Sequence, residues 1–234
     1  MPSNNNGDSI YVTGLSRPLV VMRTARARRV RIRVDARKGE AVLVLPPRAA
    51  LREGRDFAQS NAAWLRARLA ELPPRVSFEP GVEITVGGTQ YVLHWDRHAP
   101  TRVHAVGALI IVGGAREQFA QKVVEWLKRR ARERISRRAE ALAERIEKSI
   151  RRISIRDPRA RWGSCTHKGD LSFSWRLILA PANVLDYVVA HEVAHLAHLN
   201  HGPKFWALVE KLMPDFAEAR AWLDGHGPEL QRYG

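Results

Sequence analysis

The segment His191-Glu192-Val193-Ala194-His195, followed after five further residues by His201, is the most informative stretch of this chain. On an α-helix, residues four apart lie one turn apart on the same face, so His191 and His195 can reach one point in space. A continuing helix would carry His201 about 80° away from that face. The turn-forming pair Gly202-Pro203 therefore predicts that the helix ends earlier and that His201 approaches from a loop.

Three imidazoles and one carboxylate at this spacing indicate a catalytic metal centre. His191, His195 and His201 can act as nitrogen ligands of a Zn²⁺ ion, and three protein ligands leave the fourth tetrahedral position for water. Glu192 projects about 100° around the helix axis from His191, where it can act as general base without being a ligand. The spacing therefore predicts zinc-dependent hydrolysis.

His198 is an alternative third ligand, because seven residues are nearly two helical turns and return it to the face of His191. A ligand from outside the helix completes a tetrahedron more easily than three imidazoles along one side, which favours His201. The alternative without a metal is a helix with surface or capping histidines, whose apolar face packs in the core.

Basic residues are concentrated in two segments of the chain, which has a formal net charge of +15. Residues 17–37 contain eight arginines and one aspartate, and residues 116–152 contain thirteen lysines and arginines against six glutamates. Residues 153–234 are balanced, with nine of each sign. The two basic segments predict surfaces for a nucleotide, a nucleic acid or an acidic polypeptide, and a solvated basic face explains them equally well.

The composition is that of an ordinary globular protein. The 234 residues are 45% hydrophobic, which suffices for one large domain or two small ones. No apolar run approaches the ~18 residues of a membrane span, and the polar, Asn-rich start lacks a signal-peptide core. A single cysteine, Cys165, excludes an internal disulfide and agrees with a reducing compartment. We therefore expect a cytoplasmic protein with no membrane partner.

Hydrophobic periodicity predicts an α+β fold in three parts. Residues 1–14 are expected to be a disordered tail, and residues 15–113 a mostly β N-terminal subdomain with one helix at about 49–72 and hairpins at 82–95 and 101–112. Residues 114–234 are expected to form the catalytic domain. Its predicted elements are a basic amphipathic helix at 116–150, strands at 153–156 and 171–177, the histidine-bearing helix from 181, and short helices at 208–213 and 216–223.

A small β-sheet beside the histidine-bearing helix favours a peptidase among the hydrolases. An exposed strand edge next to a metal can bind an extended peptide through backbone hydrogen bonds. The chain lacks the glycine-rich phosphate loop of nucleotide kinases and ATPases, so phosphate binding would have to come from arginines. A polypeptide is therefore the expected substrate.

Several short motifs between Ile153 and Leu212 resemble one protein family. They are Arg161-Trp162-Gly163-Ser164-Cys165, Trp175-Arg176-Leu177, Ala180-Pro181, Asp186-Tyr187-Val188-Val189, His191-Glu192, His195-Leu196, Asn200-His201 and Phe205-Trp206. Together they resemble the YgjP-like zinc metallopeptidases, which are related to SprT-like proteases. The chain departs from the pattern at Ser174, where many members carry Asn.

The resemblance implies a zincin-like catalytic domain with zinc on His191, His195 and His201 and with Glu192 as the base. Some members are labelled metal-dependent UTP pyrophosphatases, and a zinc-activated water can attack either an amide carbonyl or a phosphorus atom. Three hypotheses therefore stand: a metallopeptidase, a nucleotide pyrophosphatase, and a nucleic-acid-associated SprT-like protease recruited by the basic segments.

Further side chains are candidates for supporting roles. Arg161 and Ser164 are expected near the cleft and could contact substrate, or could stabilise a turn. Tyr187 lies one turn before His191 and could donate a hydrogen bond to a developing oxyanion, although core packing is the more ordinary role. Phe205-Trp206 should wedge the His201 loop against the helix, and Asp186 and Asp215 are possible partners of the ligand imidazoles.

Overall fold

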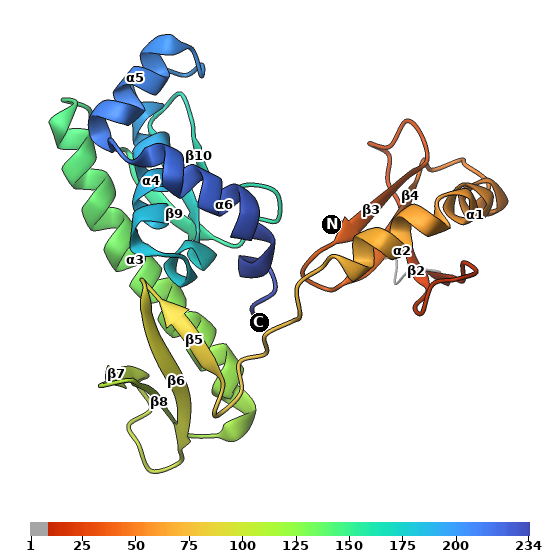
Figure 1. Ribbon diagram of the computed structural model, residues 1–234, viewed down its shortest axis with the longest axis horizontal. Helices are drawn as coiled ribbons and strands as arrows, with labels where there is room; N and C mark the ends of the chain where they lie inside the picture. Colours follow the sequence, from red (N-terminus) through yellow and green to blue (C-terminus); the bar gives the residue numbers. More distant parts are fainter. Residues whose placement is uncertain (1–8) are drawn as a thin grey trace. The chain divides into compact units, whose positions relative to one another are not determined.

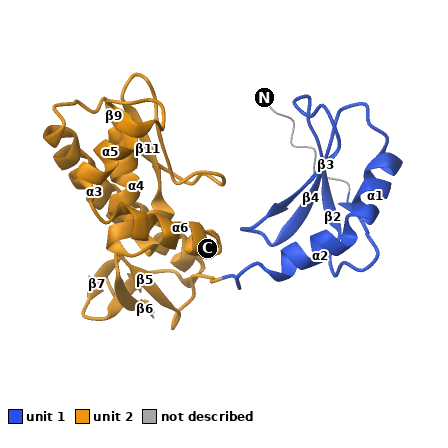
Figure 2. Cartoon of the chain, turned by 45° about the horizontal axis from the view of Figure 1, so that its top comes forward, with its two compact units in different colours: residues 1–75 blue, residues 76–234 orange. Residues whose placement is uncertain are grey.

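The computed structural model describes residues 9–234, and the chain divides into two compact units (Figures 1 and 2). The first unit ends at Arg75 and the second begins at Val76. This boundary differs from the predicted one between residues 113 and 114, because both predicted hairpins belong to the second unit and share its core.

The first unit is a four-stranded sheet covered by two helices. Its strands are β1 Ser9–Ile10, β2 Leu19–Arg23, β3 Arg31–Asp35 and β4 Glu40–Leu45, in the order β1-β2-β4-β3. The helices are α1 Leu51–Ser60 and α2 Ala62–Ala70. They replace the single predicted helix at 49–72, since the chain breaks at Asn61, whose side-chain amide donates to the carbonyl of Phe57 at 2.8 Å.

The predicted tail of residues 1–14 needs correction over its second half. Residues 1–8 lie outside the described part of the chain. Ser9–Ile10 pairs with β2, and the side chains of Ile10 and Val12 are buried in the core of the first unit. These two apolar residues therefore fix residues 9–14 to the sheet by hydrophobic burial.

The second unit contains a four-stranded sheet that packs against a long helix. The strands are β5 Glu83–Val86, β6 Thr89–Asp96, β7 His104–Val106 and β8 Leu109–Gly113, in the order β5-β6-β8-β7. A short 3₁₀ helix, η1 Arg116–Gln118, leads into α3 Phe119–Arg145. Leu93 and Ile110 of the sheet share one core with Val123 and Leu127 of the helix, which explains why the sheet belongs to this unit.

The histidine-bearing helix α4 Ala182–Ala194 lies between α3 and a three-stranded sheet. This sheet has the order β10-β11-β9, with β9 Arg152–Arg156, β10 Gly163–Cys165 and β11 Asp170–Ser174. Strand β9 pairs with β11 in parallel, whereas β10 and β11 form an antiparallel hairpin. In this part of the chain the sequence predicted strands only at 153–156 and 171–177 and not at β10, because a strand of three residues that includes a glycine has almost no periodicity.

The segment between β11 and α4 is helical where an extended strand was predicted. Residues Trp175–Leu179 form the 3₁₀ helix η2. Ser174 caps it, because the Ser174 Oγ accepts a hydrogen bond from the Arg176 backbone N–H at 3.3 Å. Ser174 is fully buried, so this position, which departs from the family pattern, has a structural role.

Two helices complete the chain, α5 Pro203–Leu212 and α6 Phe216–Leu230. Three small sheets and six α-helices in residues 9–234 confirm a mixed α and β fold. None of the helices in the described residues is long and apolar enough to cross a membrane.

Candidate metal centre

The end of α4 places the first two histidines. His191 lies in the last turn of the helix and His195 directly follows its last residue, Ala194. Beyond that point the chain tightens, with hydrogen bonds from Leu196 N–H to the Val193 carbonyl at 3.0 Å and from Ala197 N–H to the Ala194 carbonyl at 3.1 Å.

The third histidine comes from the loop between α4 and α5, as the spacing predicts. Helix α5 begins at Pro203 with Gly202 as its N-terminal cap, and His201 precedes this cap. Proline at the first helical position is favourable because its ring fixes φ and its missing N–H needs no partner there. The predicted turn before His201 is therefore confirmed.

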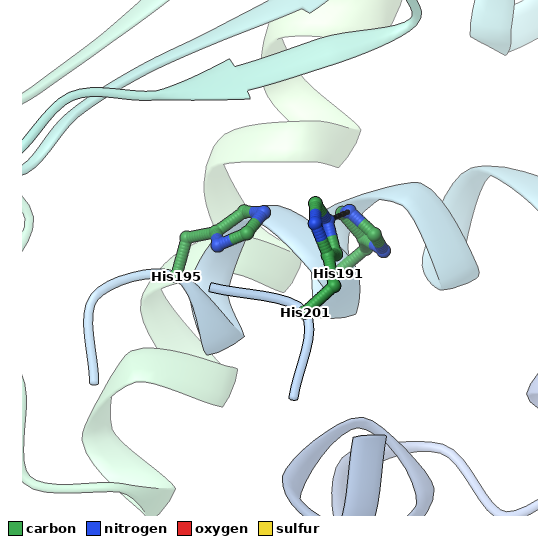
Figure 3. A group of neighbouring side chains, drawn as sticks. All are labelled: His191, His195 and His201. Atoms are coloured by element: carbon green, nitrogen blue, oxygen red, sulfur yellow. Dashed lines mark hydrogen bonds between the residues drawn. The ribbon is translucent and has the colours of Figure 1, made fainter. Parts of the chain in front are cut away.

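The three imidazoles converge on one point (Figure 3). One ring nitrogen from each of His191, His195 and His201 lies within 4.8 Å of the others, and the Nε2 atoms of His191 and His201 are 3.1 Å apart. Nitrogen ligands at tetrahedral positions about 2.05 Å from one zinc ion are ~3.3 Å apart. The donor set and its spacing therefore fit a divalent metal such as zinc.

His195 is oriented by a backbone partner rather than by a carboxylate. Its Nδ1 lies 3.0 Å from the carbonyl oxygen of His198, so Nδ1 carries the hydrogen and Nε2 keeps its lone pair for a metal. The ring of His198 is outside the three-histidine group. His198 thus contributes through its backbone, which accounts for its place in the motif without making it a ligand.

Asp186, considered as a partner of a ligand imidazole, has a different role. Its carboxylate lies 3.4 Å from Arg134 Nη2 and 3.7 Å from Arg138 Nε, on the side of α4 that faces α3. The predicted contact of Asp186 with a histidine is therefore replaced by ion pairs with α3. No other residue among 9–234 takes its place at His191, whose buried Nδ1 has no hydrogen-bond partner.

Aromatic rings enclose the three histidines. The fully buried ring of Phe205 lies 4.5–4.9 Å, centroid to centroid, from all three imidazoles, and Trp206 lies 5.8 Å from His191 and 6.0 Å from His201. Both belong to the first turns of α5, so they hold the His201 loop against α4, as predicted. Tyr187 packs edge-on against His191 at 6.0 Å and stacks on Phe216 at 6.3 Å.

The surroundings favour neutral histidines. Burial, followed by the neighbouring His195 and His201, lowers the pKa of His191 to about 4. Burial also lowers the pKa of His195, although its hydrogen bond to the His198 carbonyl opposes this. Only a neutral imidazole has a lone pair for a metal, so these two side chains are in the ligand form at neutral pH.

The side chain of Glu192 extends from α4 to the edge strand β10. It is 6% exposed, and burial raises the pKa of its carboxyl group to about 7, an effect that the nearby Arg161 reduces. A Cβ atom at Gly163 would lie 2.5 Å from both Cγ and Oε1 of Glu192. Gly163 is therefore a residue that the site requires and that the sequence reasoning missed.

The signal for Gly163 was present but unused. A glycine inside a strand weakens it and often marks a close approach of other atoms, and Gly163 lies in the middle of the motif Arg161-Trp162-Gly163-Ser164-Cys165. Its partner in that approach is Glu192, which is 29 positions away in the sequence and could not be identified from the motif alone.

Of the predicted substrate-contact residues, Ser164 lies in β10 and Arg161 precedes this strand by two residues. Arg161 and Ser164 line a cavity of about 320 Å³, together with Arg156, Gly163 and Ser172. The third, Tyr187, is buried against His191, and burial raises the pKa of its hydroxyl group. Arg161 is near enough to Glu192 to influence its pKa. The Cβ position of Gly163 faces Glu192, so the side chain of Ser164, one residue further along the strand, points to the opposite face of the sheet.

Comparison with known proteins identifies the class. The family model of the YgjP-like metallopeptidase domain matches residues 28–226, and the chain belongs to this family. A metallopeptidase domain requires a metal ion, and His191, His195 and His201 form a group that can hold one.

Two solved structures resemble part of the chain. The metallopeptidase zymogen abylysin of Pyrococcus abyssi is 22% identical, with a TM-score of 0.36 over 42% of this chain and 97% of that one. The zymogen jannalysin of Methanocaldococcus jannaschii is 20% identical, with a TM-score of 0.34 over 41% of this chain and 94% of that one. The comparison with curated proteins gives no match.

Proposed function

We propose that this chain is a zinc-dependent metallopeptidase with a zincin-like centre. The observation that carries the proposal is the convergence of three imidazoles with Glu192 buried beside them and an edge strand next to both. His191, His195 and His201 would hold the ion. When bound, zinc supplies a Lewis acid that polarises the scissile carbonyl and lowers the pKa of water.

Glu192 acts as the general base and then as the general acid. It follows His191 directly in the sequence, and its carboxyl group is held in place by the close contact with Gly163. In this role it takes a proton from the attacking water and later gives a proton to the leaving amine. Its burial excludes bulk water, which would otherwise compete for the proton.

Strand β10 is the proposed docking edge for the substrate. It is the outer strand of its sheet and pairs with β11 on one side only. An extended peptide can add to such an edge through backbone hydrogen bonds. Arg161 and Ser164 line a cavity that includes residues of the same strand, and this cavity would receive a side chain of the docked substrate.

The first test measures bound zinc and the cleavage of unfolded casein by the full chain. Glu192→Gln should retain one zinc per chain and lose casein cleavage by about 10²–10⁴-fold, the usual contribution of a general acid–base group. Glu210→Gln makes the same chemical change at an exposed position of α5 and should behave as the wild type. Cleavage that survives Glu192→Gln would contradict the proposed base.

A parallel assay with UTP separates the two hydrolytic hypotheses. The peptidase proposal expects casein cleavage and no pyrophosphate release. Pyrophosphate release without casein cleavage, lost in Glu192→Gln, would reject the peptidase and assign the same centre to a nucleotide.

A further inference from the structure

A second cavity of about 540 Å³ lies in the same unit, on the side of α4 that faces α3. One wall is the end of the β5–β8 sheet, which packs against the first half of α3 (Figure 1). Another wall is formed by η2 and α4, through Ile178 and Asp186. We call it the α3 cavity, and its volume is within the 300–1,000 Å³ that small-ligand sites occupy.

Four arginines of α3 line the α3 cavity: Arg130, Arg134, Arg137 and Arg138. Their successive spacings of four, three and one residues place them on one side of the helix, directed at the same space. Glu133 and Asp186 are the two carboxylates of the lining, so two positive charges are not compensated within it. These arginines belong to the basic segment 116–152, to which the proposed peptidase mechanism assigns no role.

The arginines have hydrogen-bonding capacity that the protein does not fill. Arg134 and Arg138 share the single carboxylate of Asp186 at 3.4 and 3.7 Å, whereas good charge-assisted hydrogen bonds measure about 2.7–2.9 Å. The Nε atoms of both arginines are shielded from solvent and make no hydrogen bond within residues 9–234. The 3.7 Å ion pair of Arg138 Nε with Asp186 is too long to be one. Arg137 lines the cavity with its side chain exposed.

Two aromatic rings complete the α3 cavity. Trp126 lies one turn before Arg130, whose guanidinium carbon is 5.9 Å from the centre of the Trp126 ring. Tyr91 of β6 lines the same space and is half-buried. The cavity thus combines a cationic stripe with flat apolar surface, which is suited to a ligand with a charged end and a planar or apolar part.

We propose that the α3 cavity binds a small phosphorylated ligand. Guanidinium groups match phosphate oxygens in two-point hydrogen bonds, and a phosphomonoester carries about −1.5 to −2 charges at neutral pH, which balances the excess of the lining. The site is separate from the metal centre. Asp186 precedes His191 by five residues, which places the two side chains about 140° apart around α4.

The test is calorimetric titration of the zinc-loaded full chain with two probes, inorganic phosphate and adenosine monophosphate, at about 50 mM salt, where charge interactions are weakly screened. Arg130→Gln/Arg137→Gln removes two cavity arginines that do not contact Asp186, and it should weaken binding of both probes at least tenfold. Circular dichroism and zinc content verify that this variant is folded.

Lys128→Gln/Arg132→Gln is the matched control. It removes the same charge from exposed positions of α3 that line none of the cavities described here, and it should weaken binding less than twofold. Tighter binding of adenosine monophosphate than of phosphate assigns the aromatic wall to an organic group, and equal binding assigns the site to phosphate alone.

Two outcomes would overturn the proposal. One is equal weakening in both double variants, which would mean diffuse attraction by a basic helix. The other is that neither probe binds the wild type. His201→Ala should bind adenosine monophosphate as the wild type does, and loss of binding in that variant would move the ligand to the metal centre.

Discussion

The two sides of α4 differ in the charge of the side chains that they present. On the His191 side, burial keeps imidazoles neutral so that their lone pairs can face a cation. On the Asp186 side, one carboxylate faces two permanently charged guanidinium groups. The first side is suited to a metal ion and the second to an anion, and about one and a half turns of helix separate them.

The two sides also differ in how they are assembled. All three proposed ligands and Glu192 lie within eleven consecutive residues, from His191 to His201. The α3 cavity collects residues from Val86 to Asp186, which meet only after the β5–β8 sheet packs against α3. A local motif can be read from sequence alone, whereas the cavity exists only in the folded chain.

The largest expected effect distinguishes the two candidate third ligands. His201→Ala removes a converging nitrogen, so zinc affinity should fall by more than the 10–100-fold that loss of an outer partner costs. His198→Ala keeps the backbone carbonyl that accepts from His195, so zinc affinity should stay within a few-fold of the wild type. Competition with a chromogenic chelator measures both constants.

The reverse order of these two affinities would restore His198 as the ligand and would mean that the α4 helix continues past Ala194 in the metal-bound protein. Equal, strong losses would indicate that the whole loop from His198 to His201 depends on side-chain contacts.

The predictability of the metal centre follows from this local construction. The helical face of His191 and His195, the turn before His201 and the packing of Phe205-Trp206 are consequences of spacing and turn chemistry, and the structure contains all three. The position of Glu192 beside the histidine face was predicted because it follows His191 by one residue. The contact of Glu192 with β10 was not predicted, because that strand has only three residues and no periodicity.

The misplaced unit boundary has a physical cause as well. Turn signals at the ends of the predicted hairpins were correct, and β5 to β8 lie where they were expected. Sequence patterns do not say which helix a sheet will pack against. Here the apolar face of the sheet meets Val123 and Leu127 of α3, so the sheet belongs to the second unit and not to the first.

The second prediction concerns the close approach on the histidine side. Gly163→Ala would place a methyl group 2.5 Å from the Glu192 side chain and force that carboxyl group to move. Displacement of a catalytic group by about 1 Å can cost ~10²-fold, so casein cleavage should fall by about 10–100-fold while zinc content is unchanged. Steady-state kinetics and elemental analysis measure the two quantities.

Gly225→Ala is the matched control for this change. Gly225 lies in α6, has no atom within 4 Å of the added methyl group, and should gain stability from the helix preference of alanine without a change in activity. If Gly163→Ala were as active as the wild type, the position of Glu192 against β10 would have no role in the reaction.

The smallest expected effect belongs to the Asp186 side. Asp186→Asn removes the charge that faces Arg134 and Arg138, but the pair is partly exposed, with side-chain exposures of 24% for Asp186 and 40% and 35% for the arginines. Solvent screening limits the contribution of such a pair to about 0.5–1 kcal/mol of unfolding free energy, which urea unfolding can resolve. The control is Asp224→Asn, which removes the carboxylate of an exposed ion pair with Arg220 at 3.9 Å. Zinc content should stay at one per chain, because Asp186 contacts α3 and not an imidazole. Loss of zinc in Asp186→Asn would mean that the two sides of α4 are coupled and that the carboxylate supports the histidines after all.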